Sequence, residues 1–298
     1  MKLNQLRDFL AVAEAGSLRA AARNLGVAQP GITRNIQELE HYLGAQLFVR
    51  VSRGVSLTPM GEKFRLRAAR ILEEARRSKE EIRQLAGEVD GSLCVAISPA
   101  GHMGILNPVF EAFRARYPDV FLHVIEGFLP AVEADLLSGA VDLYLGPVDQ
   151  ADVGAELSLT QLFENECVVI ARKGHPKADA QQLSQLCDYP WLTTSITRGV
   201  TEEFHQTFVD KGLAPPKIMA QCHTGLSLLT LLVSSDMLCV VPTSWANSSI
   251  MQGLVTPLAV DQRLFAPPFM MVHRAGLGLT PAAEYFMYLA EDIAKTSP

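Results

Sequence analysis

Residues 17–50 read SLRAAARNLGVAQPGITRNIQELEHYLGAQLFVR, and this stretch predicts two short helices joined by a tight turn. Ser17 is a good N-cap for the first helix, and Gly26 can supply the left-handed residue that ends it. The second helix starts near Gln29 and carries its apolar residues at helical spacing as far as Leu43. Because only about three residues separate the two helices, the stretch is typical of a helix-turn-helix.

Segments on either side of this pair extend the same interpretation. Residues 6–13 carry apolar side chains at helical spacing and predict a preceding helix that ends at Gly16. Residues 47–58 read as two short strands around a glycine turn, with Arg50 and Arg53 beside its tip. A basic hairpin next to a helix-turn-helix is the wing of a winged helix, whose arginines can contact phosphates or the minor groove.

The helix that begins at Gln29 turns polar side chains outward, and such side chains can bond base edges or phosphates in a major groove. A solvated polar face is the alternative for this helix taken alone, but the adjacent basic hairpin favours contact with DNA. The candidate DNA-contacting residues are Ser17, Arg19, Gln29, Pro30, Thr33, Arg34, Gln37, Arg50 and Arg53.

A long helix is predicted next, because Thr58 can cap it and Pro59 fits its first turn, and it is expected to run uninterrupted to about Gly87. Its apolar and small residues alternate steps of four and three, which is the seam of a coiled coil. Since so narrow a seam stabilises a lone helix poorly, we expect a dimer that reads a two-fold symmetric site; packing on its own domain is the alternative. The expected dimerisation residues are Phe64, Ala68, Ile71, Ala75, Ile82 and Leu85.

The run 17–50, followed by RGVSLTPMGE at 53–62, resembles the DNA-binding module of LysR-type transcriptional regulators. The resemblance implies that the start of the second helix of the pair enters the DNA groove and that both wing arginines contact DNA. It also implies a tetramer. Ala28 departs from the family pattern, which has a capping Ser there, and Gly31 stands where Ala is usual. The lost cap costs about 1 kcal/mol of helix stability.

From Ser92 onward, short apolar runs alternate with helical stretches, which predicts α/β units on mostly parallel sheets. The expected strands are 93–97, 121–126, 141–146, 166–171, 237–242 and 269–273. The expected helices lie near 102–116, 129–138, 200–211, 224–235 and 280–295. Gly- and Pro-rich crossings near 147–165 and 261–268 indicate two lobes.

The predicted architecture is α/β overall, with three parts in chain order. The resemblance implies a winged helix-turn-helix over 1–58, a linker helix over 59–90, and a periplasmic-binding-protein-like effector domain over 91–298. Within that last domain, lobe I is expected at 91–160 with 267–298, and lobe II at 161–266.

In such sheets, ligands bind beyond the carboxyl ends of the strands, where helix N-termini point inward. Three segments, around Ser98, Ser195 and Thr224, fit this description, and Arg198 is the nearby cation. We expect a small carboxylate or a neutral polar metabolite held by neutral donors; helix caps and turns without a ligand are the alternative. The candidate effector-binding residues are Ser98, Pro99, Ala100, Gly101, His102, Gly127, Phe128, Gly146, Pro147, Thr194, Ser195, Ile196 and Thr224.

Composition and charge agree with this division of the chain. Hydrophobic residues make up 48% of the 298 residues, enough for a large core. The first 70 residues hold eleven Lys and Arg against five Asp and Glu, whereas the remaining 228 hold 15 against 27. Only the N-terminal part is therefore expected to contact a polyanion. Since no apolar run reaches about 18 residues and no signal peptide is visible, we expect a soluble cytoplasmic protein without membrane contact.

Three other classes of function find less support. The sequence lacks the common nucleophile, phosphate-binding and zinc-protease motifs, so we expect no enzyme, cofactor or metal site. An effector-independent DNA binder would leave the acidic body unexplained. A thiol switch through Cys222 and Cys239 is the third class, but both lie in apolar runs that favour core packing. The sequence therefore predicts a LysR-type regulator that binds double-stranded promoter DNA, with RNA polymerase as a candidate partner.

Overall fold

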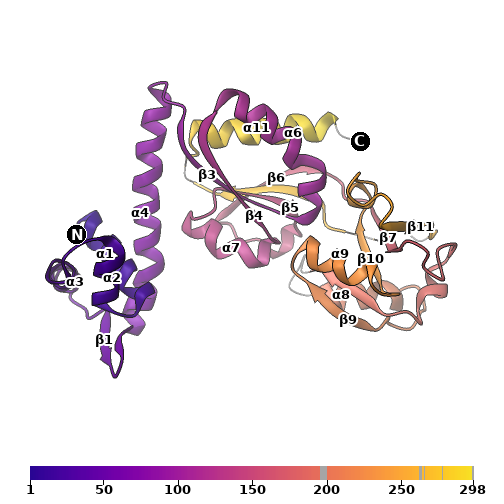
Figure 1. The fold of residues 1–298 in the computed structure, drawn as a ribbon, viewed down its shortest axis with the longest axis horizontal. Helices are drawn as coiled ribbons and strands as arrows, with labels where there is room; N and C mark the ends of the chain where they lie inside the picture. The colour runs from indigo at the N-terminus through magenta and orange to yellow at the C-terminus, as the bar shows by residue number, and fades with distance from the viewer. Residues whose placement is uncertain (195–199, 262–263, 265, 277, 297–298) are drawn as a thin grey trace. The chain divides into compact units, whose positions relative to one another are not determined.

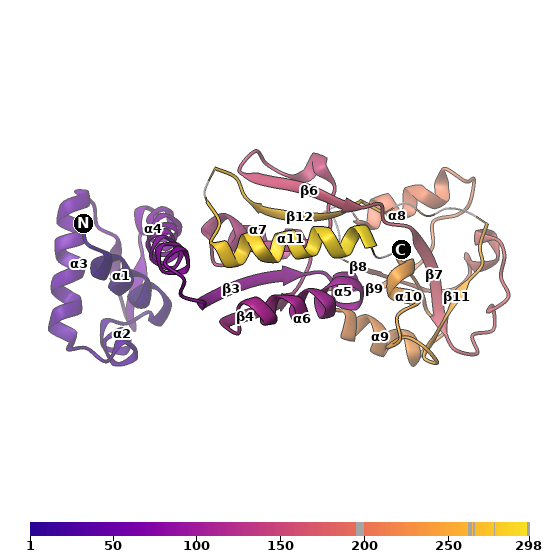
Figure 2. The same cartoon turned by 90° about the horizontal axis from the view of Figure 1, so that it is seen from above.

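The computed structural model of the chain divides into two compact units, Met1–Ile82 with Ser138–Ala140, and Arg83–Leu137 with Val141–Pro298. Figures 1 and 2 show the elements of each unit. The structure describes residues 1–194, 200–261, 264, 266–276 and 278–296. Within these residues, no helix combines the length and the apolar character needed to cross a membrane.

The N-terminal unit is a winged helix-turn-helix, as predicted. Its elements are α1 (Leu3–Ala15), α2 (Leu18–Leu25), α3 (Gln29–Leu43), β1 (Phe48–Val51), β2 (Gly54–Leu57) and α4 (Pro59–Leu85). The Ser17 hydroxyl accepts from the Ala20 N–H, and Gly26 closes α2 in the left-handed conformation, so both predicted signals act as expected. Helix α3 has no side-chain cap at Ala28. The three helices enclose one core, in which Phe9 and Ile32 are fully buried.

Helix α4 begins as predicted, because the Thr58 hydroxyl accepts from the Gly61 N–H at 3.0 Å. Its first half does not form a free seam. Ala68 is fully buried in the core of the N-terminal unit, and the Phe64 ring lies 5.2 Å from the Phe9 ring. Ala68 is therefore covered by its own domain, whereas Phe64 is half-buried and its contact with a second chain stays a prediction.

The remaining predicted seam residues of α4 lie in its middle and its second half. Ala75 is half-buried, whereas Ile71, Ile82 and Leu85 are 37%, 67% and 68% exposed. Ile82 and Leu85 are thus the most exposed of the predicted seam residues, although Met60 and Leu66 in the first half are also exposed apolar residues.

The first sheet of the C-terminal unit has the strand order β4-β3-β5-β12-β6. Its strands are β3 (Asp90–Ile97), β4 (Asp119–Glu126), β5 (Leu143–Pro147), β6 (Leu157–Phe163) and β12 (Phe269–Arg274). Helices α6 (Asn107–Arg116) and α11 (Pro281–Thr296) cover one face, and α7 (Leu129–Ser138) covers the other (Figure 1). Leu143 and Leu145 of β5 therefore belong to one core and Tyr144 to the other.

The second sheet has the strand order β11-β7-β10-β8-β9. Its strands are β7 (Cys167–Arg172), β8 (Trp191–Thr194), β9 (Ile218–Cys222), β10 (Leu238–Pro242) and β11 (Val255–Leu258). Helices α9 (Gly225–Val233) and α10 (Thr243–Ala246) contribute to the core around Trp245 on one face. Helix α8 (Val200–Val209) contributes Phe208 to the core around Trp191 on the other.

Both sheets are mixed, which corrects the prediction of mostly parallel sheets. Strand β12 runs antiparallel to β5 and β6, and β7 runs antiparallel to β10 and β11. Strands β6, β8, β9 and β11 were not predicted, and β6 lies inside the expected crossing 147–165. Three of these four strands are sheet edges, where one side stays polar and no apolar run marks the strand.

The helix predicted near 102–116 is interrupted. A short helix α5 (Pro99–Gly101) leads into a π-helical turn over His102–Leu106, and α6 follows. Pro108 has no N–H to continue the α-helical hydrogen bonds of that turn, which gives a physical reason for the irregular start. Such π-helical turns are frequent at functional sites.

Candidate functional site

Helix α3 divides into a buried side and an exposed side. Ile32, Ile36 and Leu39 belong to the core of the N-terminal unit. The predicted DNA-contacting residues of α3 lie away from that core: Gln29, Pro30, Arg34 and Gln37 are exposed, and Thr33 is half-buried. The Thr33 hydroxyl donates to the Gln29 carbonyl at 3.1 Å. This side of α3 therefore offers amide, hydroxyl and guanidinium groups to a DNA groove.

A polar network that was not predicted ties α3 to α1. The buried Asp8 carboxylate accepts from Asn35 Nδ2 at 2.6 Å, and Gln5 Nε2 donates to Glu38 at 3.0 Å. Glu38 also accepts from Arg34 Nε at 2.8 Å, and this hydrogen bond holds the pKa of Glu38 below its ordinary value. Arg34 is thus oriented by residues that are anchored in α1. In the sequence, the one sign of this network is the Asp8 carboxylate, which lies next to the apolar stripe of α1.

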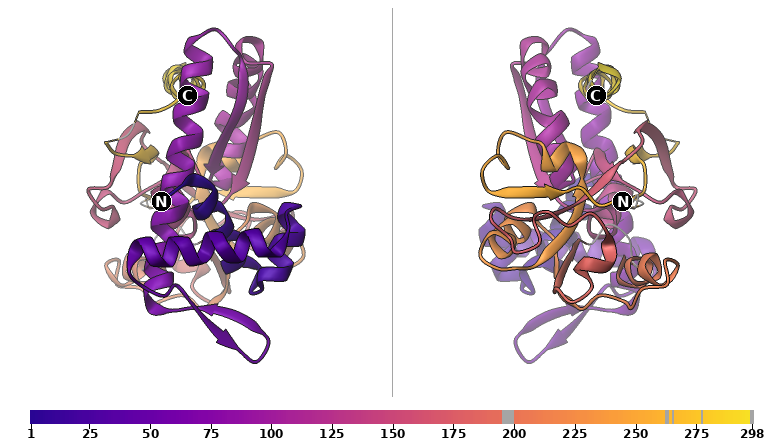
Figure 3. Two further views of the ribbon diagram at one scale, coloured as in Figure 1. Left: turned by 90° about the vertical axis from the view of Figure 1, so that its left-hand side faces the viewer. Right: turned by 90° about the vertical axis from the view of Figure 1, so that its right-hand side faces the viewer.

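The β1–β2 hairpin carries both predicted wing arginines, and Arg50 and Arg53 are exposed. Figure 3 shows the hairpin extending away from the three helices. The hairpin is held near its turn by the Val55 N–H, which donates to the Gly16 carbonyl at 2.9 Å. Gly54 has a φ of +109°, and a Cβ there would lie 2.2 Å from the Gly16 carbonyl oxygen, so only glycine fits.

The two remaining predicted DNA-contacting residues stand at the start of α2. The Ser17 hydroxyl is engaged in the N-cap of α2, and the Arg19 side chain is exposed. Arg19 is therefore available to a phosphate, whereas Ser17 shapes the helix start.

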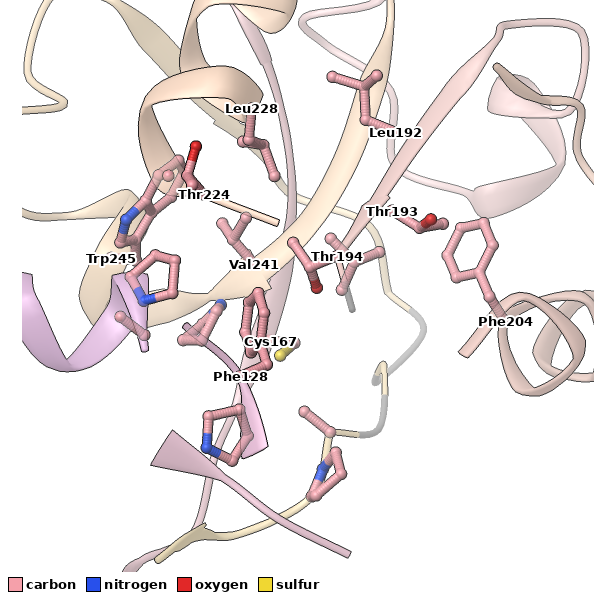
Figure 4. Close-up of a pocket in the computed structure, with 18 of the residues that line it drawn as sticks. Phe128, Cys167, Leu192, Thr193, Thr194, Phe204, Thr224, Leu228, Val241 and Trp245 are labelled. Atoms are coloured by element: carbon pink, nitrogen blue, oxygen red, sulfur yellow. The ribbon is translucent and has the colours of Figure 1, made fainter. Parts of the chain in front are cut away.

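A cavity of about 350 Å³ lies between the two sheets of the C-terminal unit (Figure 4). It is bounded by the start of α5, the ends of β5, β8 and β10, the starts of α9 and α10, and the chain segment before β12. The lining residues are Pro99, Ala100, Phe128, Pro147, Asp149, Cys167, Leu192, Thr193, Thr194, Phe204, Thr224, Gly225, Leu228, Val240, Val241, Pro242, Trp245, Ala266 and Pro267. A cavity at the carboxyl ends of α/β strands is where such folds bind ligands.

The cavity brings six of the predicted effector-binding residues together: Pro99, Ala100, Phe128, Pro147, Thr194 and Thr224. Ser195 and Ile196 lie outside the described residues, as does Arg198.

The other described residues of the predicted effector site do not line this cavity, and their part in ligand binding stays a prediction: they are Ser98, Gly101, His102, Gly127 and Gly146. Ser98 is fully buried, and its hydroxyl accepts from the Gly101 N–H. His102 Nδ1 lies 3.0 Å from the Ser98 carbonyl oxygen. Gly146 is packed so closely that a Cβ would lie 2.2 Å from the Tyr144 hydroxyl, and Gly127 does not line the cavity either.

Sequence reasoning missed the apolar part of this wall. Leu192, Leu228 and Val241 occur in runs that read as ordinary core, and Phe204 and Trp245 lie in helices that carried no site signal. Their shared feature is proximity to the ends of β8 and β10, and β8 was itself not predicted.

The helix N-terminus that faces the cavity is already occupied by groups of this chain. The Gly225 N–H of α9 donates to the Glu126 carboxylate, which reaches across from the end of β4. The Thr224 hydroxyl accepts from the Ser227 N–H at 3.2 Å. Among the described lining residues, Asp149 is the sole charged one.

The described cysteines are all free thiols. Cys222 and Cys239 are buried in the core beside α9, as the core-packing interpretation expected, and burial raises the pKa of the Cys239 thiol. Burial also raises the pKa of Cys167, which lines the cavity, to about 12. A thiol with so high a pKa is a poor nucleophile at neutral pH.

Comparison with known families gives two matches that together cover almost the whole chain. The family model described as "LysR substrate binding domain" matches residues 86–294. The chain belongs to the LysR family. The model described as "Bacterial regulatory helix-turn-helix protein, lysR family" matches residues 3–62 of this LysR-family protein. It is a DNA-binding transcriptional regulator with an effector-binding domain, and the thiol-switch alternative is not favoured.

Individual relatives resemble this LysR-family regulator along its full length. The SDS degradation transcriptional activation protein of a Pseudomonas species is 28% identical over 99% of this chain and 98% of its own length. The regulator TdcA of Escherichia coli K12 is 25% identical over 98% of this chain and 93% of its own. The crystal structure of the LysR family regulator CbnR has a TM-score of 0.72 at 24% identity and covers 99% of each chain, which shows the same fold.

Proposed function

We propose that this LysR-family regulator senses a small organic molecule in the cavity between its two sheets and thereby changes how it binds promoter DNA. The carrying observation is the cavity of about 350 Å³, whose wall is mostly apolar with a few polar groups. Such cavities are the usual sites for small ligands, and this volume lies at the small end of their range of about 300–1,000 Å³. The substrate-binding family match over residues 86–294 supports the same assignment.

The exposed side of α3 is proposed to read bases, and the wing to bind the phosphate backbone. Gln29, Thr33, Arg34 and Gln37 offer side chains that match base edges, and the anchored Arg34 suits a guanine. Pro30, Arg19 and the wing arginines are assigned to shape and phosphate contacts, which add affinity without sequence information. A solved complex of full-length CbnR with its target DNA has a TM-score of 0.70 to this chain and supports a DNA-bound form of this fold.

Self-association is proposed to use the second half of α4. Ile82 and Leu85 are apolar and more than 60% exposed, which leaves a stripe for a second chain. Two chains would then present two α3 helices to a symmetric site, and pairs of dimers would form a tetramer. We assign the protein to the cytoplasm, where bacterial promoters lie, with RNA polymerase as a further partner and no catalytic role.

The proposed mechanism is a shift between two arrangements of the sheets. Phe128 lines the cavity from the side of the first sheet, and Leu228 lines it from the side of the second sheet. A ligand that contacts both residues favours the arrangement of the sheets in which both contacts are possible. In an oligomer, that shift changes the spacing of the winged helices and hence the DNA bend.

A thermal-shift screen of the full-length chain against small organic molecules tests this proposal, since a ligand of the native state raises the melting temperature. A ligand of the cavity should stabilise the wild type and the control Leu226→Trp, whose side chain is 74% exposed on α9. It should not stabilise Leu228→Trp, which fills the cavity. A ligand that binds the cavity but leaves the affinity and footprint on the operator unchanged contradicts the proposal.

A further inference from the structure

We infer that the effector is an uncharged, mainly apolar molecule that carries a hydroxyl or carbonyl group, and not a carboxylate. This inference rests on the proposed function, because it names the chemical class of ligand for the same cavity. Three observations carry it: the chain's own carboxylate at the positive helix end, the absence of a basic group from the described wall, and a buried hydroxyl that has no partner among the described residues.

The first observation concerns the place where an anion would most readily bind. The N-terminus of α9 faces the cavity, and backbone N–H groups at such an end attract negative charge. Glu126 already accepts from the Gly225 N–H, and the Thr224 hydroxyl accepts from the Ser227 N–H. A ligand carboxylate would have to displace Glu126 and would meet its negative charge nearby.

The second observation concerns charge compensation elsewhere in the wall. None of the described lining residues is basic, and Asp149 adds a further negative charge. A carboxylate that moves from water into this cavity loses its hydration without gaining an ion pair with a described residue. Aromatic and aliphatic side chains, such as Phe128, Phe204 and Trp245, instead favour apolar ligand surface.

The third observation identifies a polar anchor. Thr193 lines the cavity and is only 5% exposed, yet its Oγ1 has no hydrogen-bond partner among the described residues. Figure 4 shows its side chain directed toward Phe204. The Trp245 indole N–H is a second buried donor of the wall without a partner in the described chain. Buried polar groups normally have a hydrogen-bond partner, so a ligand with one neutral polar group would supply the partner for the Thr193 hydroxyl.

The test uses matched probes that differ only in their polar end. Alcohols, carboxylates and primary amines on phenylethyl, cyclohexylethyl and hexyl skeletons are titrated into the full-length chain by isothermal calorimetry at neutral pH. We expect at least one alcohol to bind about 10-fold or more tightly than the carboxylate and the amine of the same skeleton, since burying an unpaired charge costs more than about 1.4 kcal/mol.

Two substitutions locate the binding. Thr193→Val should weaken the alcohols about 3- to 10-fold, the loss expected for one hydrogen bond, whereas the control Thr160→Val on β6 should not. Leu228→Trp should abolish binding that the exposed control Leu226→Trp retains. Arg198→Gln should leave the alcohols unaffected.

The outcomes separate this inference from the proposed function. A carboxylate or amine probe that binds more tightly than the alcohol of the same skeleton overturns the inference. If Leu228→Trp abolishes the binding of that probe, the cavity is still the ligand site and the proposed function stands. Absence of binding by every probe at about 10 mM also overturns the inference. The cavity function itself fails if Leu228→Trp regulates its promoter like the wild type in cells.

Discussion

Replacing Gly54 by alanine should detach the wing from the helices of the DNA-binding unit. The Cβ of the alanine would lie 2.2 Å from the Gly16 carbonyl oxygen, and that contact is with backbone, which cannot rotate away. The residue would also keep a φ of +109°, which L side chains rarely adopt. The hydrogen bond from the Val55 N–H to the same carbonyl would then be lost.

The structure gives an order of magnitude for this change. Holding a non-glycine residue in such a backbone conformation costs about 1–3 kcal/mol, and the lost hydrogen bond adds about 1 kcal/mol. The sum of about 2–4 kcal/mol corresponds to about a 30- to 1,000-fold shift toward a wing that has left its site. Arg50 and Arg53, which flank the hairpin tip, would lose their fixed position.

Fluorescence anisotropy with an operator duplex, located by genomic footprinting, measures the consequence. We expect Gly54→Ala to bind at least about 10-fold more weakly, with a salt dependence reduced by about two phosphate contacts, each of which contributes about 0.9 to the slope. Gly31→Ala is the matched control: Gly31 is helical, nothing lies within 4 Å of the added Cβ, and the change should stabilise α3 by about 0.5–1 kcal/mol. Wild-type affinity and salt slope in Gly54→Ala would refute the role of the docked wing.

Three further predictions address the rest of the chain. Asp8→Ala leaves Asn35 without its buried acceptor and should lower the free energy of unfolding by about 1–3 kcal/mol in urea titrations; an unchanged midpoint would contradict the network. Burial raises the pKa of Cys167 to about 12, so at pH 8 iodoacetamide should alkylate this thiol about 1,000-fold more slowly than a free thiol. The alkylation rate should rise with pH. Alkylation at the rate of a free thiol would contradict the burial of Cys167. Glu126→Ala should free the Gly225 N–H and strengthen the carboxylate probes several-fold in calorimetry, and equal weakness in both proteins would speak against Glu126 as the excluding charge.

The winged helix could be predicted almost residue by residue, because its boundaries are set locally. Gly16, Gly26 and Gly44 each end a helix in the left-handed conformation, and Ser17 starts one with its hydroxyl. Such signals act within a few residues of the chain and need no tertiary context. The packing partner of Phe64 could not be predicted in the same way, since an apolar stripe on a helix can pack equally well against a partner helix or against its own domain.

The position of the cavity could be predicted from the sequence, but most of the residues that line it could not. The rule that ligands bind beyond strand ends selected Pro99 and Thr224, and both residues line the cavity. It could not separate Ser98, whose hydroxyl closes a local turn, from residues that face open space. The apolar wall depends on β8 lying between β10 and β9, and that pairing is a property of the whole sheet.

Footprinting of the operator with and without a cavity ligand tests most directly whether the two functional parts communicate. With an alcohol shown by calorimetry to bind, we predict a changed footprint length or DNA bend for the wild type and for Leu226→Trp, and no change for Leu228→Trp. An identical footprint for the wild type with its cavity empty and saturated would contradict the coupling of ligand binding to DNA recognition.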